Sequence, residues 1–211
     1  MSINDIHEIC DGVFIGSINS SKNSTLLQEK KIKYILNCTP AKDCDNRLES
    51  TNLFEYWRIP VDDQVVEEKD EEQFTRYMDE AADYIQLSIE KKKNILVHCH
   101  SGASRSPLFV ACYLVKHLKM SVDAALILLK EKRQFVSINF DFLKRLGEFG
   151  KKYEEEKKSD DSSSSIKGEE ITVSRKDNRK FYQVNWSASG CITGNEHPET
   201  SGGKSMYYIY R

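Results

Sequence analysis

Short apolar runs alternate with longer amphipathic stretches along most of the chain. Four runs have the length and the β-branched or aromatic content of buried strands: Val13–Gly16, Lys33–Cys38, Phe54–Ile59 and Asn94–Val97. Each ends at or just before glycine, proline or polar residues, which commonly form turns. The pattern therefore predicts strands at these four places, the first of them beginning at Val13.

Amphipathic helices are predicted between and after these strands. Apolar side chains recur at steps of three and four residues at Phe74, Tyr77, Met78, Ala81, Ile85 and Ile89. Helix caps are expected at Ser24, Ser121 and Asn139, which precede Thr25–Lys30, Val122–Leu129 and a stretch with Phe142, Leu143, Leu146 and Phe149 on one side. Alternating strands and helices predict an α/β fold, in which a central, mixed, mostly parallel sheet is flanked by helices and binds ligands at the carboxyl ends of its strands.

The composition changes near Glu154, where a charged helix end runs into a row of serines that offers nothing to pack. We place a main domain at residues 1–157, a serine- and acid-rich linker at 158–170 and a C-terminal extension at 171–211. Strand character at Ile171–Val173, Phe181–Trp186 and Met206–Tyr210 predicts a small β-like appendage. Two roles stay open for it: a hairpin element that packs on the main domain, or an aromatic peptide that binds a partner.

The segment Val97–Pro107, of sequence VHCHSGASRSP, joins the last predicted strand to another predicted helix, Pro107–Val115. Proline suits the first turn of a helix because its missing N–H would have no partner there. A loop before a helix can point several backbone N–H groups inward, and the helix start adds a partial positive charge. Such a loop favours a tetrahedral oxyanion, with phosphate as the leading candidate.

Four residues of this loop suit phosphoryl chemistry. Cys99 lies at a helix start near a guanidinium, which favours its thiolate form and makes it a candidate nucleophile. Arg105 can hold two phosphate oxygens with its planar fork. Gly102 permits a backbone approach that a Cβ would block, and the Ser106 hydroxyl can stabilise the sulfur as it leaves. A lone cysteine after a strand is more often a small buried hydrophobe, as expected for Cys112, so this interpretation depends on the combination.

His98-Cys99, five further residues and then Arg105-Ser106 resemble the signature of the cysteine-dependent protein tyrosine phosphatases, and the form HCxxGxSRSP is similar to their dual-specificity subgroup. The predicted opening of strand, short helix and strand also resembles the start of dual-specificity phosphatase domains. The resemblance implies a protein tyrosine phosphatase-like fold and hydrolysis in two steps through a phosphocysteine, without a metal or other cofactor. It implies phosphate-binding positions at His100, Ser101, Gly102, Ala103, Ser104 and Arg105, with His98 as a supporting residue.

Such chemistry needs a proton donor for the leaving oxygen, and a carboxylate pair follows the Phe54–Ile59 strand. In the family that this chain resembles, the general acid is an aspartate four residues past the isoleucine of such a strand, which corresponds to Asp63. Asp62, one residue away, stays an alternative. The acidic stretch Val65–Glu72 makes the separation between Asp63 and Cys99 a few residues longer than is usual for the family.

The variable loop positions carry no lysine or arginine that could bind additional phosphates. The resemblance therefore points to phosphoproteins carrying phosphotyrosine and phosphoserine or phosphothreonine, with a protein kinase among the candidate partners. Two alternatives stay open: a phosphatase of a non-protein ester, such as an RNA 5′ end, a glycan or a lipid, and a non-catalytic phosphopeptide-binding module. The presence of Cys99, Arg105 and Asp63 together favours turnover.

The net charge of −2 gives the chain no field that would attract nucleic acid. No apolar run reaches the roughly 18 residues of a membrane span, and the first residues show neither a secretory signal nor a myristoylation glycine. The six cysteines are too scattered for a zinc site and indicate reduced thiols, hence a cytoplasmic protein with nuclear access left open. Cys38 or Cys44 could trap an oxidised Cys99 as a disulfide, although two ordinary thiols are the commoner case.

Overall fold

The computed structural model describes residues 5–44, 47–64 and 70–161, together with short strands at 175–176, 179–180, 182–184 and 205–207. The chain divides into two units, Met1–Ser159 and Asp160–Arg211. The segment Val97–Pro107 lies entirely in the first unit.

A five-stranded sheet forms the centre of the first unit, with the strand order β1-β2-β5-β3-β4. Its strands are β1 (Ile6–Cys10), β2 (Val13–Gly16), β3 (Ile32–Asn37), β4 (Glu55–Arg58) and β5 (Asn94–His98). The three pairings among β2, β5, β3 and β4 are parallel, whereas β1 and β2 form an antiparallel hairpin. The prediction of a mixed, mostly parallel sheet is confirmed. The strand β1 was not predicted, because its alternation of apolar and polar residues is too short to stand out.

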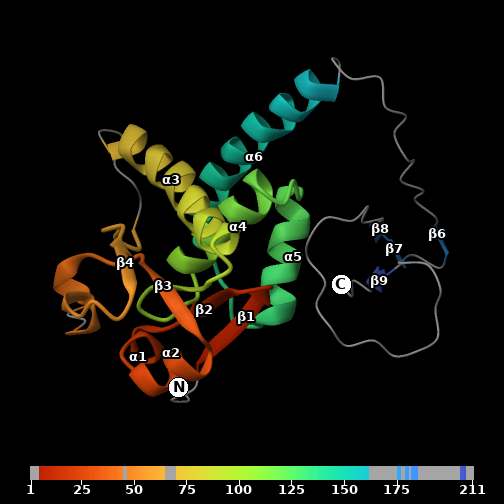
Figure 1. Cartoon of the computed structure of the whole chain (residues 1–211). Helices are drawn as coiled ribbons and strands as arrows, with labels where there is room; N and C mark the ends of the chain where they lie inside the picture. The colour runs from red at the N-terminus through yellow and green to blue at the C-terminus, as the bar shows by residue number, and fades with distance from the viewer. Residues whose placement is uncertain are drawn as a thin grey trace. The chain divides into compact units, whose positions relative to one another are not determined.

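Helices cover both faces of this sheet (Figure 1). Their bounds are α1 (Ile18–Ser21), α2 (Ser24–Glu29), α3 (Glu71–Glu90), α4 (Arg105–Lys116), α5 (Val122–Lys132) and α6 (Phe140–Asp161), with short 3-10 turns η1 (Ala41–Asp43) and η2 (Arg47–Ser50). The predicted caps at Ser121 and Asn139 are confirmed, since their side chains accept hydrogen bonds from the backbone N–H groups of Ala124 and Phe142. The cap expected at Ser24 was wrong by one residue: the Asn23 side chain caps α2 instead.

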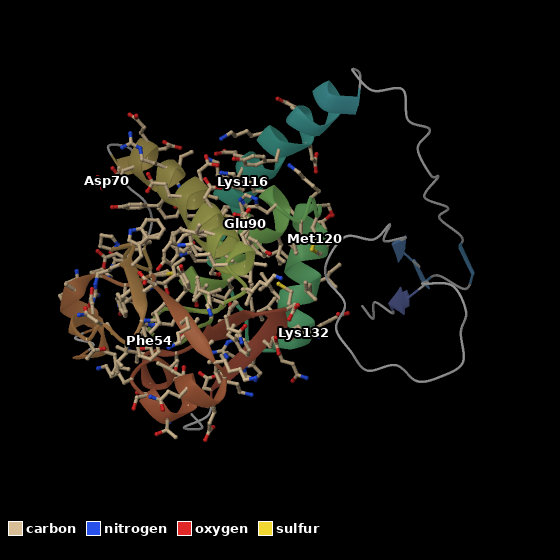
Figure 2. The ribbon with its side chains drawn as sticks, viewed as in Figure 1. Phe54, Asp70, Glu90, Lys116, Met120 and Lys132 are labelled. Carbon is tan, nitrogen blue, oxygen red and sulfur yellow. The ribbon has the colours of Figure 1, made fainter. Side chains whose placement is uncertain are left out.

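The alternation of side chains along the strands divides the core into two layers. Val13, Ile15, Leu36, Ile95 and Val97 pack against α3, α4, α5 and α6, whereas Phe14, Ile35 and Leu96 pack against α2 on the other face. Figure 2 shows the side chains that fill the space between the elements, with Asp70 and Glu90 marking the two ends of α3. Helix α4 is buried along almost its whole length, from Arg105 to Val115. Because α4 cannot shift without disrupting this core, the loop that leads into it is fixed in place.

The second unit contains two antiparallel strand pairs, β6 (Arg175–Lys176) with β7 (Arg179–Lys180) and β8 (Tyr182–Val184) with β9 (Ser205–Tyr207). The predicted strand Ile171–Val173 lies outside the described residues, and of the other two predicted strands only parts are described. In the described part of the chain, no helix combines the length and the apolar character of a membrane span.

Candidate active site

The motif loop begins where the central strand of the sheet ends. His98 is the last residue of β5 and is paired with Gly16 of β2 on one side and with Asn37 of β3 on the other. Cys99 therefore follows directly at the carboxyl ends of three parallel strands, and the loop closes into the first turn of α4 at Arg105. The predicted strand-loop-helix junction is confirmed, and it has the location in which α/β sheets bind their ligands.

The carbonyl groups of this loop are bonded outward, to the surrounding scaffold. Those of His98, His100 and Ala103 accept from the backbone N–H groups of Cys38, Ile18 and Ser137 at 2.8, 3.1 and 2.8 Å, and that of Ser104 accepts the first hydrogen bond within α4, from Leu108 at 3.1 Å. Those of Ser101 and Gly102 accept from a buried guanidinium at 3.0 and 2.8 Å. These carbonyl groups are therefore occupied by hydrogen bonds, while the Gly102 N–H faces the Cys99 sulfur and the loop leads into the start of α4, which is the arrangement of an anion-binding cradle.

Cys99 lies in the floor of this cradle, and the residue is 1% exposed. The backbone N–H of Gly102 donates to its sulfur at 3.2 Å, and the hydroxyl of Ser106 donates to it at 3.4 Å. Hydrogen bonds of this kind stabilise negative charge on sulfur. The structure thus brings together Cys99, Gly102 and Ser106, as the sequence predicted.

The guanidinium behind the loop belongs to Arg133, which follows α5 and was not predicted as a site residue. Its side chain is fully buried and pairs with the Asp5 carboxylate at 2.8 Å. The same side chain stacks on the Phe135 ring, with 4.1 Å between its Cζ and the ring centroid. Arg133 therefore ties the catalytic loop to the N-terminus of the domain. No local sequence signal could have found it, because its partners lie 31 and 128 residues away.

Gly102 is the loop residue that lies closest to the Arg133 guanidinium. Its φ of +71° lies in the left-handed region, and a Cβ there would come within 2.5 Å of the Arg133 guanidinium and 2.6 Å of the Gly16 carbonyl oxygen. Gly102→Ala is expected to lower the free energy of unfolding by about 2 kcal/mol, as measured by urea denaturation, because both the backbone angle and the contacts oppose a methyl group.

Gly147→Ala is the matched control for that measurement. Gly147 lies in α6, and nothing lies within 4 Å of the position that a Cβ would take. Alanine there should raise the free energy of unfolding by up to about 1 kcal/mol, since alanine has the higher helix propensity. Equal effects of the two substitutions would contradict the close approach at Gly102.

Arg105 and Asp63 lie side by side at the rim of the cradle. The Arg105 Nη1 donates to the Val61 carbonyl at 3.0 Å, and its Nε is 3.8 Å from the Asp63 carboxylate. Arg105 is 5% exposed, whereas the Asp63 side chain is 39% exposed and so reaches solvent. Asp62 lies 3.4 Å from the Lys42 ammonium, and both of their side chains are exposed.

Two further side chains hold the Asp63 carboxylate. The Ser104 hydroxyl donates to its Oδ1 at 2.7 Å, and the Asn139 side-chain amide donates to the same oxygen at 3.3 Å. Asn139 was predicted only as a helix cap, and it does cap α6 through its Oδ1. Its second contact was not predicted, because the two residues are 76 positions apart in the sequence.

His98, the residue before Cys99, is buried beneath the loop. The ring is fully buried, its Nδ1 lies 3.5 Å from the Cys99 carbonyl oxygen, and its Nε2 has no hydrogen-bond partner among the described residues. Burial lowers the pKa of His98 to about 3, so the ring is neutral at physiological pH. Cys38 is equally buried, and burial raises its pKa, so its thiol is protonated.

The remaining predicted positions lie around the opening of the loop. His100 is exposed and Ser101 and Ala103 are partly exposed, whereas Ser104 is buried against Asp63. Within the described ranges, no group of three or more histidine, cysteine or acidic side chains could hold a metal ion.

The parallel sheet, the cradle and its cysteine define the class of the cysteine-dependent phosphatases. A family model described as "Dual specificity phosphatase, catalytic domain" matches residues 13–152, and the chain belongs to this family. Human dual specificity protein phosphatase 6 is 29% identical over 177 residues, covering 84% of this chain and 44% of that protein. Human dual specificity protein phosphatase 9 is 32% identical over 142 residues, covering 67% of this chain and 35% of that protein. The chain thus spans less than half the length of these relatives.

Solved structures show the same fold. The human tyrosine phosphatase-like serine/threonine/tyrosine-interacting protein matches with a TM-score of 0.64 and 26% identity, over 70% of this chain and 97% of that one. Human DUSP28 matches with a TM-score of 0.62 and 17% identity, over 71% of this chain and 95% of that one. The predicted phosphatase-like fold is thereby confirmed.

Proposed function

We propose that this protein hydrolyses phosphoprotein monoesters through a phosphocysteine intermediate, with Cys99 as the nucleophile. One observation carries the proposal: the loop around the Cys99 sulfur bonds its carbonyls outward and keeps donors around the sulfur. Preorganised donors of this kind stabilise the negative charge of a phosphoryl group as it is transferred. The membership of the chain in the dual specificity phosphatase family supports the same reaction.

In the first step the thiolate of Cys99 attacks phosphorus, and the bond from phosphorus to the leaving oxygen breaks. Asp63, protonated at this stage, gives its proton to that oxygen. Arg105 leaves its contact with the Val61 carbonyl and binds two phosphoryl oxygens with its fork.

In the second step water attacks phosphorus, the Asp63 carboxylate takes the proton from the water, and the sulfur–phosphorus bond breaks. The Ser106 hydroxyl, already 3.4 Å from the sulfur, stabilises the departing thiolate. Inorganic phosphate leaves, and Cys99 and Asp63 return to their starting states.

Asp63 rather than Asp62 is proposed as the general acid. Two donors and Arg105 orient the Asp63 carboxylate at the rim, whereas Asp62 lies beside an exposed lysine. Asp63→Asn should lower kcat toward a phosphopeptide by about 10²- to 10³-fold with little change in KM, because the amide cannot transfer the proton. Asp62→Asn, the matched control, should change kcat less than about threefold by the same reasoning, and the reverse outcome would assign the role to Asp62.

The substrates proposed are proteins that carry phosphotyrosine and phosphoserine or phosphothreonine, a protein kinase among them. No lysine or arginine other than Arg105 stands in the loop to select additional phosphates. A cytoplasmic location is proposed as well, and the free thiols of Cys38, Cys44, Cys99 and Cys112 support it.

A panel of substrates tests this function. Short phosphotyrosine and phosphothreonine peptides should be hydrolysed with a higher kcat/KM than phosphoinositides, a 5′-phosphorylated RNA or a glycan phosphate. A higher kcat/KM toward one of the non-protein esters would overturn the assignment of substrate class. Binding of phosphopeptides without any hydrolysis would overturn the assignment as an enzyme.

A further inference from the structure

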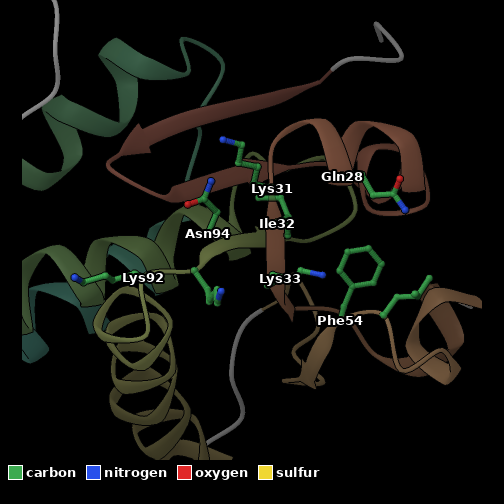
Figure 3. Close-up of a pocket in the computed structure, with 9 residues that line it drawn as sticks. Gln28, Lys31, Ile32, Lys33, Phe54, Lys92 and Asn94 are labelled. Carbon is green, nitrogen blue, oxygen red and sulfur yellow. The ribbon is translucent and has the colours of Figure 1, made fainter.

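A cavity of about 380 Å³ lies at the amino-terminal ends of β3 and β5, opposite to the strand ends that carry the catalytic loop. Its walls come from the end of α2, the segment before β4 and the turn between α3 and β5 (Figure 3). Cavities of this size hold one small organic molecule. The cavity shares no residue with the proposed catalytic machinery.

Four of the side chains that line the cavity are lysines: Lys31, Lys33, Lys92 and Lys93. Among the described residues, none of these four forms an ion pair, whereas Lys116 of the same domain contacts two carboxylates. The chain as a whole carries a net charge of −2, so the excess of positive charge is local. Such a cluster of positive charge attracts anions and slows their dissociation.

Lysines at the ends of α2 and α3 could serve only to complement the carbonyl groups of those helix ends. The backbone already provides that complement: the N–H of Lys31 donates to the Gln28 carbonyl at 2.9 Å, and the N–H of Lys92 donates to the Ile89 carbonyl at 2.8 Å. The ammonium groups of Lys31 and Lys92 are therefore not required for that role.

The other wall of the cavity is apolar. Leu53 is 53% exposed and lines this wall together with Phe54 and Ile32. Figure 3 shows the Lys33 side chain extending toward the Phe54 ring, whereas Lys92 extends away from it. An anionic group and an apolar ring on one molecule would satisfy both walls, which inorganic phosphate alone cannot do.

We propose that this cavity binds an organic phosphate of nucleotide size. Its ring packs on Phe54 and Leu53, and its phosphate is held by Lys33 and Lys93. Binding there is independent of catalysis, since the catalytic loop lies at the other end of the strands.

The test uses ¹⁵N-labelled full-length protein carrying Cys99→Ser, so that no ester is consumed. Adenosine 5′-monophosphate is the probe, with adenosine and inorganic phosphate as reference ligands. The expected result is a chemical-shift change at the amides of Ile32 and Asn94 that titrates separately from any change at Gly102. The affinity of this site for the nucleotide should exceed its affinity for either reference ligand at least about tenfold, because neither reference engages both walls.

Charge reversal at Lys33→Glu together with Lys93→Glu should weaken this binding at least about tenfold, because both proposed phosphate contacts become repulsive. In the background with Cys99 intact, the same pair should leave hydrolysis of p-nitrophenyl phosphate unchanged. Lys130→Glu with Lys151→Glu, an equal charge change on α5 and α6, should leave the binding unchanged.

Three results would overturn the proposal: shift changes confined to the catalytic loop, an equal response to inorganic phosphate alone, or binding that survives the charge reversal. A response to an acidic peptide but not to the nucleotide would overturn the ligand class. If the reversed variant fails to fold, Lys33→Gln with Lys93→Gln makes the same test with a smaller expected loss.

Discussion

Cys99→Ser is expected to lower kcat toward any phosphomonoester substrate by about 10⁴-fold or more, because a serine hydroxyl is a far weaker nucleophile at neutral pH than a thiolate. The substitution replaces a sulfur that already receives two hydrogen bonds, so the cradle should still close around phosphate. Substrate affinity should therefore change little while turnover is lost. Steady-state kinetics together with equilibrium binding of a phosphopeptide measure the two quantities.

Cys112→Ser is the control for this experiment. Cys112 lies in α4, the helix that follows the Cys99 loop, and is fully buried, and burial raises the pKa of its thiol. A serine hydroxyl in that core should lower the free energy of unfolding by about 1 to 3 kcal/mol and leave kcat per folded molecule nearly unchanged. Loss of turnover in the control but not in Cys99→Ser would place the nucleophile elsewhere.

Arg105→Lys is expected to lower kcat/KM by about 10²- to 10³-fold, although it keeps the positive charge. Lysine presents a point charge and cannot bind two phosphoryl oxygens with a planar fork, and it also loses the contact of Arg105 with the Val61 carbonyl. Most of the loss in kcat/KM should come from kcat rather than from KM. The reason is that the two-oxygen contact of the guanidinium stabilises the charge of the transition state more than that of the bound substrate. Steady-state kinetics with p-nitrophenyl phosphate and with a phosphopeptide should show the same ratio of mutant to wild-type kcat/KM.

Arg145→Lys serves as the matched substitution. Arg145 of α6 pairs with Asp141 and Glu71, both at 3.0 Å, and its side chain is 12% exposed. Lysine keeps the positive charge beside both carboxylates, and Arg145 lies outside the loop, so kcat/KM should change little. A loss of activity equal to that of Arg105→Lys would show that the effect does not depend on the position of Arg105 in the phosphate-binding loop.

The strands, the helix caps and the catalytic loop could be predicted because each is encoded in neighbouring residues. The period of apolar side chains locates β2, β3, β4 and β5, and the order of residues from His98 to Pro107 locates the loop. The hairpin strand β1 escaped prediction because His7 and Glu8 interrupt its short apolar pattern. The cap of α2 was misassigned because Asn23 and Ser24 are both favourable cap residues and stand side by side.

The residues that complete the site could not be predicted, because they reach it through the tertiary fold. Arg133 meets the loop carbonyls only after α5 packs beside β1, and Asn139 meets Asp63 only after the start of α6 reaches the rim. Each of these residues has an ordinary local role, as a residue after a helix or as a helix cap. The choice between Asp62 and Asp63 likewise depends on geometry that spacing alone does not give.

The central claim is that the phosphoryl group passes through the sulfur of Cys99. It is tested most directly by rapid acid quenching of the protein during turnover of a phosphopeptide, followed by mass spectrometry of its peptides. We predict one added phosphoryl group on the peptide that contains Cys99, and none in Cys99→Ser. A phosphoryl group on another residue, or undiminished turnover by Cys99→Ser, would contradict the mechanism.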